Sequence, residues 1–134
     1  KIISVVHAGW KGAYIGIIRK VIKFLIKNGS NAKDLIAVIG PSISQKNYEI
    51  QKDFKDKFLK KDKRNKIFFK LIKNKTYFSL NKCIYSELKK LGVNNLEIIN
   101  KDTFDPKNNF FSARRSIHNK ENDYGRNISI IMIN

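Results

Sequence analysis

The chain has 134 residues, 42% of them apolar, and carries a formal net charge of +17 from 28 Lys and Arg against 11 Asp and Glu. This length fits one domain. The single cysteine excludes an intrachain disulfide and a four-cysteine zinc site, and no apolar run approaches the roughly 20 residues of a membrane span. Lysine supplies 23 of the 28 basic residues, whereas nucleic-acid recognition favours the planar fork of arginine. We therefore interpret the charge as a solvated lysine surface and expect a cytoplasmic protein without a nucleic-acid or membrane partner.

The first half of the chain alternates predicted strands with a helix. The apolar run at 2–6 predicts a strand, and the glycine-flanked segment 7–12 predicts a turn after it. Apolar residues then recur every three or four positions over 14–25, which predicts an amphipathic helix, and Asn28-Gly29 is typical of a helix end. A second short strand is predicted at 35–39.

The second half predicts a short helix, a hairpin, a second helix and further strands. The expected elements are a helix over 50–58, hairpin strands at 67–72 and 76–80, a helix at 80–91, strands at 96–99 and 127–133, and loops at 102–109 and 116–126. Because the early strands alternate with a helix and the later ones are hairpin-linked, we predict one α+β domain over 1–134. It would consist of mixed α/β layers, with a mixed β-sheet and flanking helices.

His7 is the first candidate site residue. It stands where a predicted strand ends and a turn into a helix begins, which is where α/β proteins place functional residues. Gly9 and Gly12 allow the backbone to approach a ligand closely, and Trp10 between them is placed to wall a pocket. The structural alternative is a histidine that caps the sheet through a backbone hydrogen bond. The spacing does not match the phosphate loop GxxxxGK[ST].

Three of the five arginines stand near the C-terminus, namely Arg114, Arg115 and Arg126. In a chain that otherwise uses lysine, these positions indicate a need for the fork geometry of arginine. Two interpretations remain open. The arginines bind phosphate or ribose, or they stabilise the fold through salt bridges to Asp102, Asp105 or Asp123.

Cys83 and His118 are weaker candidates. Cys83 falls on the apolar face of the predicted helix 80–91, which favours a buried structural thiol over a nucleophile. His118 lies in a polar run and is interpreted as a solvated loop residue.

Four motifs, in order along the chain, resemble those of a known family. The segment His7-Ala8-Gly9-Trp10-Lys11-Gly12 is similar to the HAGW[RK]G signature of YfiH-type proteins. These are also called the multicopper polyphenol oxidase (laccase) domain family, which includes the peptidoglycan editing factor. The other matching stretches are Gly40-Pro41-Ser42-Ile43 followed by Tyr48-Glu49-Ile50, Asp105-Pro106 followed by Phe110-Phe111-Ser112-Ala113-Arg114-Arg115, and Gly125-Arg126.

The resemblance implies a cysteine-hydrolase-like YfiH fold and a longer domain, truncated here at its N-terminus, whose C-terminal half is 1–134. It also implies one metal site made of two histidines and one cysteine. His7 matches the second histidine, and the other two ligands would lie upstream of Lys1. Family members are described as zinc-dependent purine nucleoside phosphorylases with adenosine deaminase activity, and older labels call them copper oxidases. We expect zinc rather than copper, because three protein ligands leave a fourth tetrahedral position open, whereas a multicopper oxidase needs many more histidines and cysteines.

The resulting hypothesis is that the intact protein cleaves adenosine and related nucleosides with phosphate, giving the free base and ribose 1-phosphate, with a deaminase side activity. In it, His7 holds the metal, while Lys11, Arg114, Arg115 and Arg126 bind substrate or phosphate. Trp10 and Tyr48 wall the purine pocket. This chain alone is expected to bind zinc poorly and to be inactive. Two alternatives stay open: a copper-dependent polyphenol oxidase, and a non-catalytic basic module that binds nucleic acid.

Overall fold

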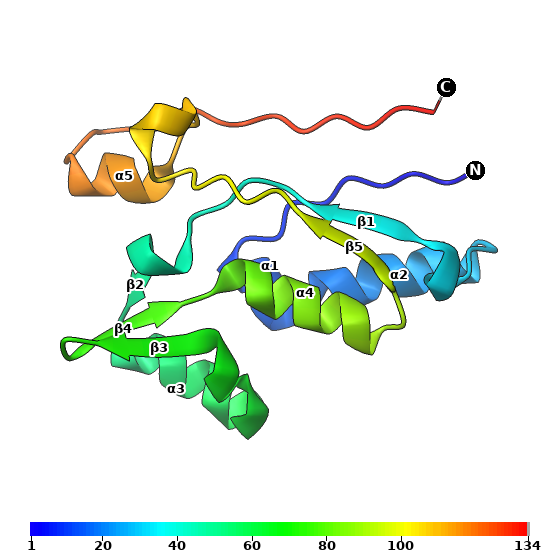
Figure 1. Cartoon of the computed structure of the whole chain (residues 1–134), viewed down its shortest axis with the longest axis horizontal. Helices are drawn as coiled ribbons and strands as arrows, with labels where there is room; N and C mark the ends of the chain where they lie inside the picture. Colours follow the sequence, from blue (N-terminus) through cyan, green and yellow to red (C-terminus); the bar gives the residue numbers. More distant parts are fainter. Residues whose placement is uncertain (134) are drawn as a thin grey trace.

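The computed structural model describes residues 1–133, and its strands form two separate sheets (Figure 1). β1 (Ile36–Ile39) pairs in parallel with β5 (Asn95–Ile98). β2 (Glu49–Ile50), β4 (Lys75–Phe78) and β3 (Phe69–Ile72) form an antiparallel sheet in that spatial order. The predicted α+β class is confirmed, with the parallel and antiparallel pairs in different sheets.

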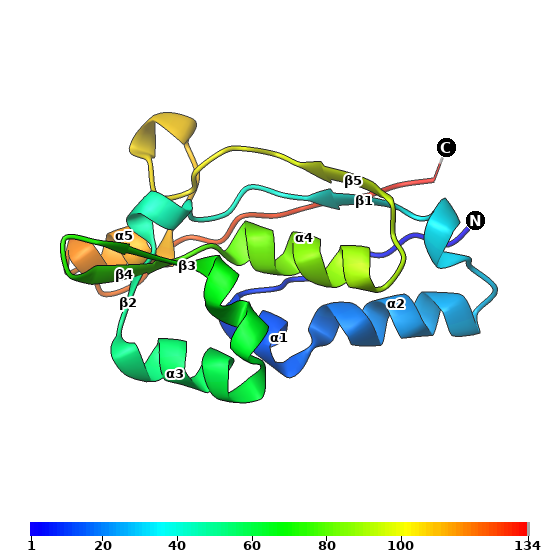
Figure 2. The same ribbon diagram turned by 60° about the horizontal axis from the view of Figure 1, so that its bottom comes forward.

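Five α-helices are described within residues 1–133; one packs against the parallel sheet, and two more pack against that helix. Figure 2 shows α4 (Leu80–Lys90) lying between the β1–β5 sheet and the pair formed by α1 (Trp10–Ile15) and α2 (Ile17–Lys27). The other two helices are α3 (Lys52–Lys61) and α5 (Ala113–His118). No helix within residues 1–133 is long and apolar enough to cross a membrane.

The helix predicted over 14–25 is in fact two helices. Gly16 adopts a left-handed backbone conformation (φ 83°), and its N–H donates to the carbonyl of Ala13 to close α1. Glycine adopts this conformation at little cost, so the chain can turn here and begin α2 at once. The predicted end of the helix at Asn28-Gly29 is confirmed, with Gly29 also left-handed (φ 89°).

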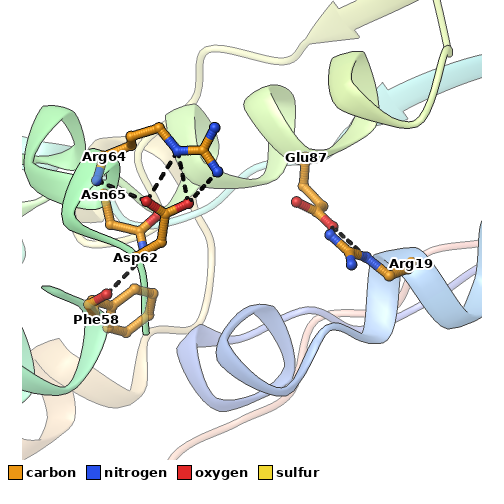
Figure 3. Close-up of polar contacts among 6 residues, drawn as sticks. All are labelled: Arg19, Phe58, Asp62, Arg64, Asn65 and Glu87. Atoms are coloured by element: carbon orange, nitrogen blue, oxygen red, sulfur yellow. Dashed lines mark hydrogen bonds and ion pairs between the residues drawn. The ribbon is translucent and has the colours of Figure 1, made fainter. Parts of the chain in front are cut away.

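α2 and α4 meet through the apolar faces that their periodicity predicted. Buried residues recur every three or four positions on both helices: Ile18, Ile22 and Leu25 on α2, and Leu80, Ile84 and Leu88 on α4. At the edge of this contact Arg19 donates to Glu87 across 2.9 Å (Figure 3). The same view shows Asp62 bound to Arg64 in the 3-10 helix (Lys63–Phe68) that follows α3.

An aromatic cluster fills the space between α3 and the antiparallel sheet. Phe78 of β4 is 0% exposed, and its ring centroid lies 5.0 Å from that of Phe58 and 5.1 Å from that of Phe54. Those two side chains are four residues apart on α3, so they share one helix face. Phe69 and Tyr48 complete the cluster, at 5.2 and 5.7 Å from Phe78.

The predicted hairpin is confirmed with shorter strands. Lys73 and Asn74 both have positive φ (46° and 62°), as a two-residue type I′ turn requires. β3 begins only at Phe69, because the two preceding residues belong to the 3-10 helix. β4 ends at Phe78 because Ser79 caps α4, its side chain accepting from the N–H of Lys82.

The strand predictions at 2–6 and 127–133 are wrong for the described chain. Both segments are extended and run on the side of the molecule that carries β1 (Figure 1), but neither pairs with a strand among residues 1–133. Their apolar side chains stay exposed, for example 54% for Val5 and 84% for Ile128. A strand needs a hydrogen-bonded neighbour as well as an apolar pattern. The predicted loop 116–126 also begins inside α5.

Candidate functional site

His7 lies in the extended segment directly before α1, and its side chain is exposed. A Cβ on Gly9 would meet the His7 Nε2 at 3.3 Å, and one on Gly12 would meet the Ile17 side chain at 3.3 Å. The two glycines therefore make room for the imidazole and for the start of α2. This is the close backbone approach that the motif predicted, with groups of the chain itself as the neighbours.

Trp10, three residues after the histidine, forms part of the wall of a surface hollow of about 310 Å³. Its lining comes from α1, β2 and the residues beside it, α3 and α5: Trp10, Tyr48, Glu49, Ile50, Gln51, Asp53, Phe54, Lys57 and Arg114. The Trp10 and Phe54 ring centroids are 4.9 Å apart. The volume falls at the lower end of the roughly 300–1,000 Å³ typical of small-ligand sites. Three predicted site residues, Trp10, Tyr48 and Arg114, thus meet in one hollow.

Arg114 is held against the aromatic wall. Its guanidinium carbon lies 5.1 Å from the centroid of the Tyr48 ring, and its Nη1 donates to the carbonyl of Glu49 at 2.7 Å. Burial raises the pKa of the Tyr48 hydroxyl, and the charge of Arg114 partly opposes that shift. Tyr48, only 7% exposed, therefore stays neutral near pH 7 and presents a ring face to the cation.

Arg115 points elsewhere, although it is the next residue. Its Nη1 donates to the carbonyls of Thr103 and Phe104 at 2.9 and 3.0 Å, and its Nη2 donates to the carbonyl of Phe110 at 2.6 Å. The guanidinium thus ties the middle of the segment between β5 and α5 to the part of it close to α5. This geometry favours the fold-stabilising interpretation, with backbone carbonyls as partners in place of the carboxylates that we had considered.

Arg126 and Lys11 are exposed and are not among the residues that line the hollow. Arg126 lies 3.6 Å from Asp123 and 3.9 Å from the centroid of the Tyr124 ring, so one predicted salt bridge is present. The ammonium of Lys11 lies 5.7 Å from the Trp10 ring centroid. A basic side chain therefore stands beside the aromatic wall without entering the lining.

Asp102 pairs with none of the arginines. It accepts hydrogen bonds from the Ser44 backbone N–H at 3.1 Å, the Ser44 hydroxyl, Asn47 Nδ2 at 2.7 Å and the Phe104 N–H at 2.9 Å. Burial alone would raise the pKa of Asp102, but these hydrogen bonds outweigh burial and lower it. The carboxylate fastens the segment that leads to Tyr48 onto the loop after β5.

Sequence reasoning missed the two charged residues that α3 contributes to the hollow, Asp53 and Lys57. They lie four positions apart on α3, beside Phe54, and form an ion pair of 3.8 Å. The periodicity that predicted a helix here places 53, 54 and 57 on one side of it. The sequence did not show that this face of α3 lies next to Trp10.

The described residues do not form a metal site by themselves. Within residues 1–133, no group of three His, Cys, Asp or Glu side chains is close enough to hold an ion. His7 supplies a single accessible imidazole. Burial, with a smaller contribution from Glu87, raises the pKa of Cys83 to about 11, so its thiol is a poor nucleophile near neutral pH. His118 is exposed and stands edge-on to Phe104 at 5.5 Å between ring centroids.

Comparison with known proteins supports the family resemblance that the four motifs indicated. Residues 1–134 match the family described as multi-copper polyphenol oxidoreductase laccase. A purine nucleoside phosphorylase of Rickettsia conorii is 40% identical over 130 residues, which cover 96% of this chain and 53% of that protein. The corresponding protein of Rickettsia prowazekii is 38% identical over 120 residues, 88% of this chain and 49% of its own length. The chain thus spans about half the length of these relatives.

Two solved structures share the fold. The YfiH protein of Bacillus licheniformis superposes with a TM-score of 0.75 at 32% identity, covering 84% of this chain and 44% of that one. A Neisseria meningitidis protein superposes with a TM-score of 0.72 at 26% identity, covering 82% and 45%. The region that matches the family model includes both the histidine motif before α1 and the arginines of α5. By sequence over its whole length and by fold, the chain belongs to the multi-copper polyphenol oxidoreductase laccase family, the YfiH type that its four motifs indicated.

Proposed function

We propose that the intact protein is a purine nucleoside phosphorylase that acts on adenosine and related nucleosides. The observation that carries the proposal is the hollow beside the His7 motif, in which Trp10, Tyr48 and Arg114 meet. Relatives that bear the name purine nucleoside phosphorylase support it. Because those relatives are about twice as long as the matched region, the activity is proposed for the intact protein.

In this reaction an oxygen of phosphate forms a bond to C1′ of the ribose while the bond between C1′ and the purine nitrogen breaks. The base leaves with the electron pair and is protonated. The aromatic wall of Trp10 suits a planar purine ring. Arg114 would hold phosphate, because its Nη1 alone is hydrogen bonded to the described residues and its other guanidinium nitrogens remain available as donors. Arg115 would act by positioning, and Lys11 and Arg126 would contribute charge near the site.

The metal belongs to the proposal as well. His7 would be one ligand of a zinc ion, and an upstream segment of the intact protein would supply a further histidine and a cysteine. Hydrolytic deamination of adenosine is the proposed side activity. The family description names a polyphenol oxidoreductase, so a copper-dependent oxidase is the second candidate. Metal analysis of the intact protein, together with oxidation assays on a phenolic substrate, separates the two.

The direct experiment measures adenine and inosine released from adenosine by the intact protein, with and without phosphate. We expect adenine release to depend on phosphate. Replacing His7 by Ala should remove the metal and both activities together, while Arg114→Lys should leave the metal bound and weaken phosphorolysis more than deamination. Adenine release that is equal without phosphate, or full activity in the His7→Ala protein, would contradict the proposal.

A further inference from the structure

Lys57 is a cation of the hollow that none of the family motifs contains. It projects from α3 into the lining that also includes Trp10 and Arg114. We infer that Lys57 and Arg114 together form a two-cation site for a phosphate group. The ligand is inorganic phosphate or a phosphate ester, and the identification of phosphate as a substrate rests on the proposed function.

The two cations differ in how firmly they are held. Arg114 is packed on the Tyr48 ring and hydrogen bonded to the Glu49 carbonyl, so its position is set before a ligand arrives. The side chain of Lys57 is 57% exposed, and its ammonium lies 3.8 Å from Asp53. An exposed pair at this distance is weak. Lys57 can therefore turn from the carboxylate to an incoming anion at little cost.

Two carboxylates share the hollow, and they set the affinity. The side chain of Glu49 is bound to Lys75 at 3.0 Å, which offsets its charge. Asp53 has Lys57 as its partner and competes directly with phosphate for it. The site should therefore bind phosphate weakly in the wild-type chain. Removing the Asp53 charge should strengthen binding. A generally basic surface would instead predict the same gain from removing any of its acidic side chains.

The chain carries its own reporter for this site. Trp10 is the single tryptophan and lines the hollow, so its fluorescence can be followed while phosphate is added against sodium chloride of equal ionic strength. We expect a saturable change. A unit charge at about 4 Å in water is worth about 1 kcal/mol, which converts to about a fivefold change in affinity. Lys57→Gln should weaken binding by about this factor, and Asp53→Asn should strengthen it severalfold.

Matched variants make the test specific. Lys57→Arg should bind phosphate as the wild type does. Lys60→Gln, on the exposed side of the same helix and outside the lining, should leave the titration unchanged. No saturable response beyond that of chloride, or equal affinities in the wild type and Lys57→Gln, would overturn the inference. Phosphate binding without any phosphorolysis by the intact protein would instead remove the proposed function and leave the site in place.

Discussion

Replacing Arg115 by Lys should destabilise the fold and leave phosphate binding intact. Its guanidinium donates to three backbone carbonyls at 2.6–3.0 Å, two of them in the middle of the segment between β5 and α5 and one close to α5. The single nitrogen of a lysine keeps the charge but cannot reach all three. A hydrogen bond to a charged group contributes about 1.5–3 kcal/mol. With two bonds lost and water replacing part of them, we expect a cost of about 2–3 kcal/mol.

For a chain of this size each kcal/mol lowers the melting temperature by roughly 4 °C, so Arg115→Lys should melt about 10 °C below the wild type. Circular dichroism during heating measures this directly. Arg114→Lys is the matched control, because it loses one carbonyl contact and the stacking on Tyr48. Its melting temperature should fall less than that of Arg115→Lys, since one carbonyl bond is lost in place of two, but it should bind phosphate more weakly. An unchanged melting temperature for Arg115→Lys, combined with a larger loss of phosphate affinity than Arg114→Lys shows, would refute this division of roles.

Four further outcomes are expected. Phe78→Ala should lower the free energy of unfolding in urea by about 3–5 kcal/mol, because it opens a cavity at the centre of the aromatic cluster. The lowered pKa of Asp102 contributes stability above its unfolded pKa of about 4, and this stability is lost as pH falls through the folded value. Acid titration of the melting temperature should therefore be flatter in Asp102→Asn. Ellman's reagent should react with Cys83 about tenfold more slowly in the folded than in the unfolded chain, because its pKa rises from 9.0 to about 11 and the smaller thiolate fraction outweighs the higher nucleophilicity of the more basic thiolate. The apolar segments 2–6 and 128–133 are exposed and pair with no strand within residues 1–133, so the isolated chain should self-associate in sedimentation experiments. A monodisperse, thermally robust monomer would contradict that reasoning.

Local sequence was sufficient wherever neighbouring residues decide the backbone. The helix end at Asn28-Gly29, the presence of a hairpin turn after residue 72 and the buried stripe of α4 follow from turn chemistry and from the 3.6-residue period. The turn itself is one residue shorter than the predicted 73–75, because Lys75 already pairs with Ile72 in β4. Gly16 is the exception. Gly16 ends α1 through its left-handed conformation, but the apolar pattern continues on both sides of it and therefore predicted one continuous helix.

The sequence by itself determined the α+β class, most element positions and the family, because periodicity, turn residues and four ordered motifs are written along the chain. Only the tertiary structure decided which of two adjacent arginines faces the hollow. Residues 114 and 115 on a helix point about 100° apart. Which partner each side chain meets depends on the folded positions of Tyr48, for residue 114, and of the carbonyls at 103, 104 and 110, for residue 115. The tertiary structure also decided that the apolar segments 2–6 and 127–133 pair with no strand within residues 1–133. An apolar pattern favours a strand, but a strand forms only where a hydrogen-bonding partner lies beside it.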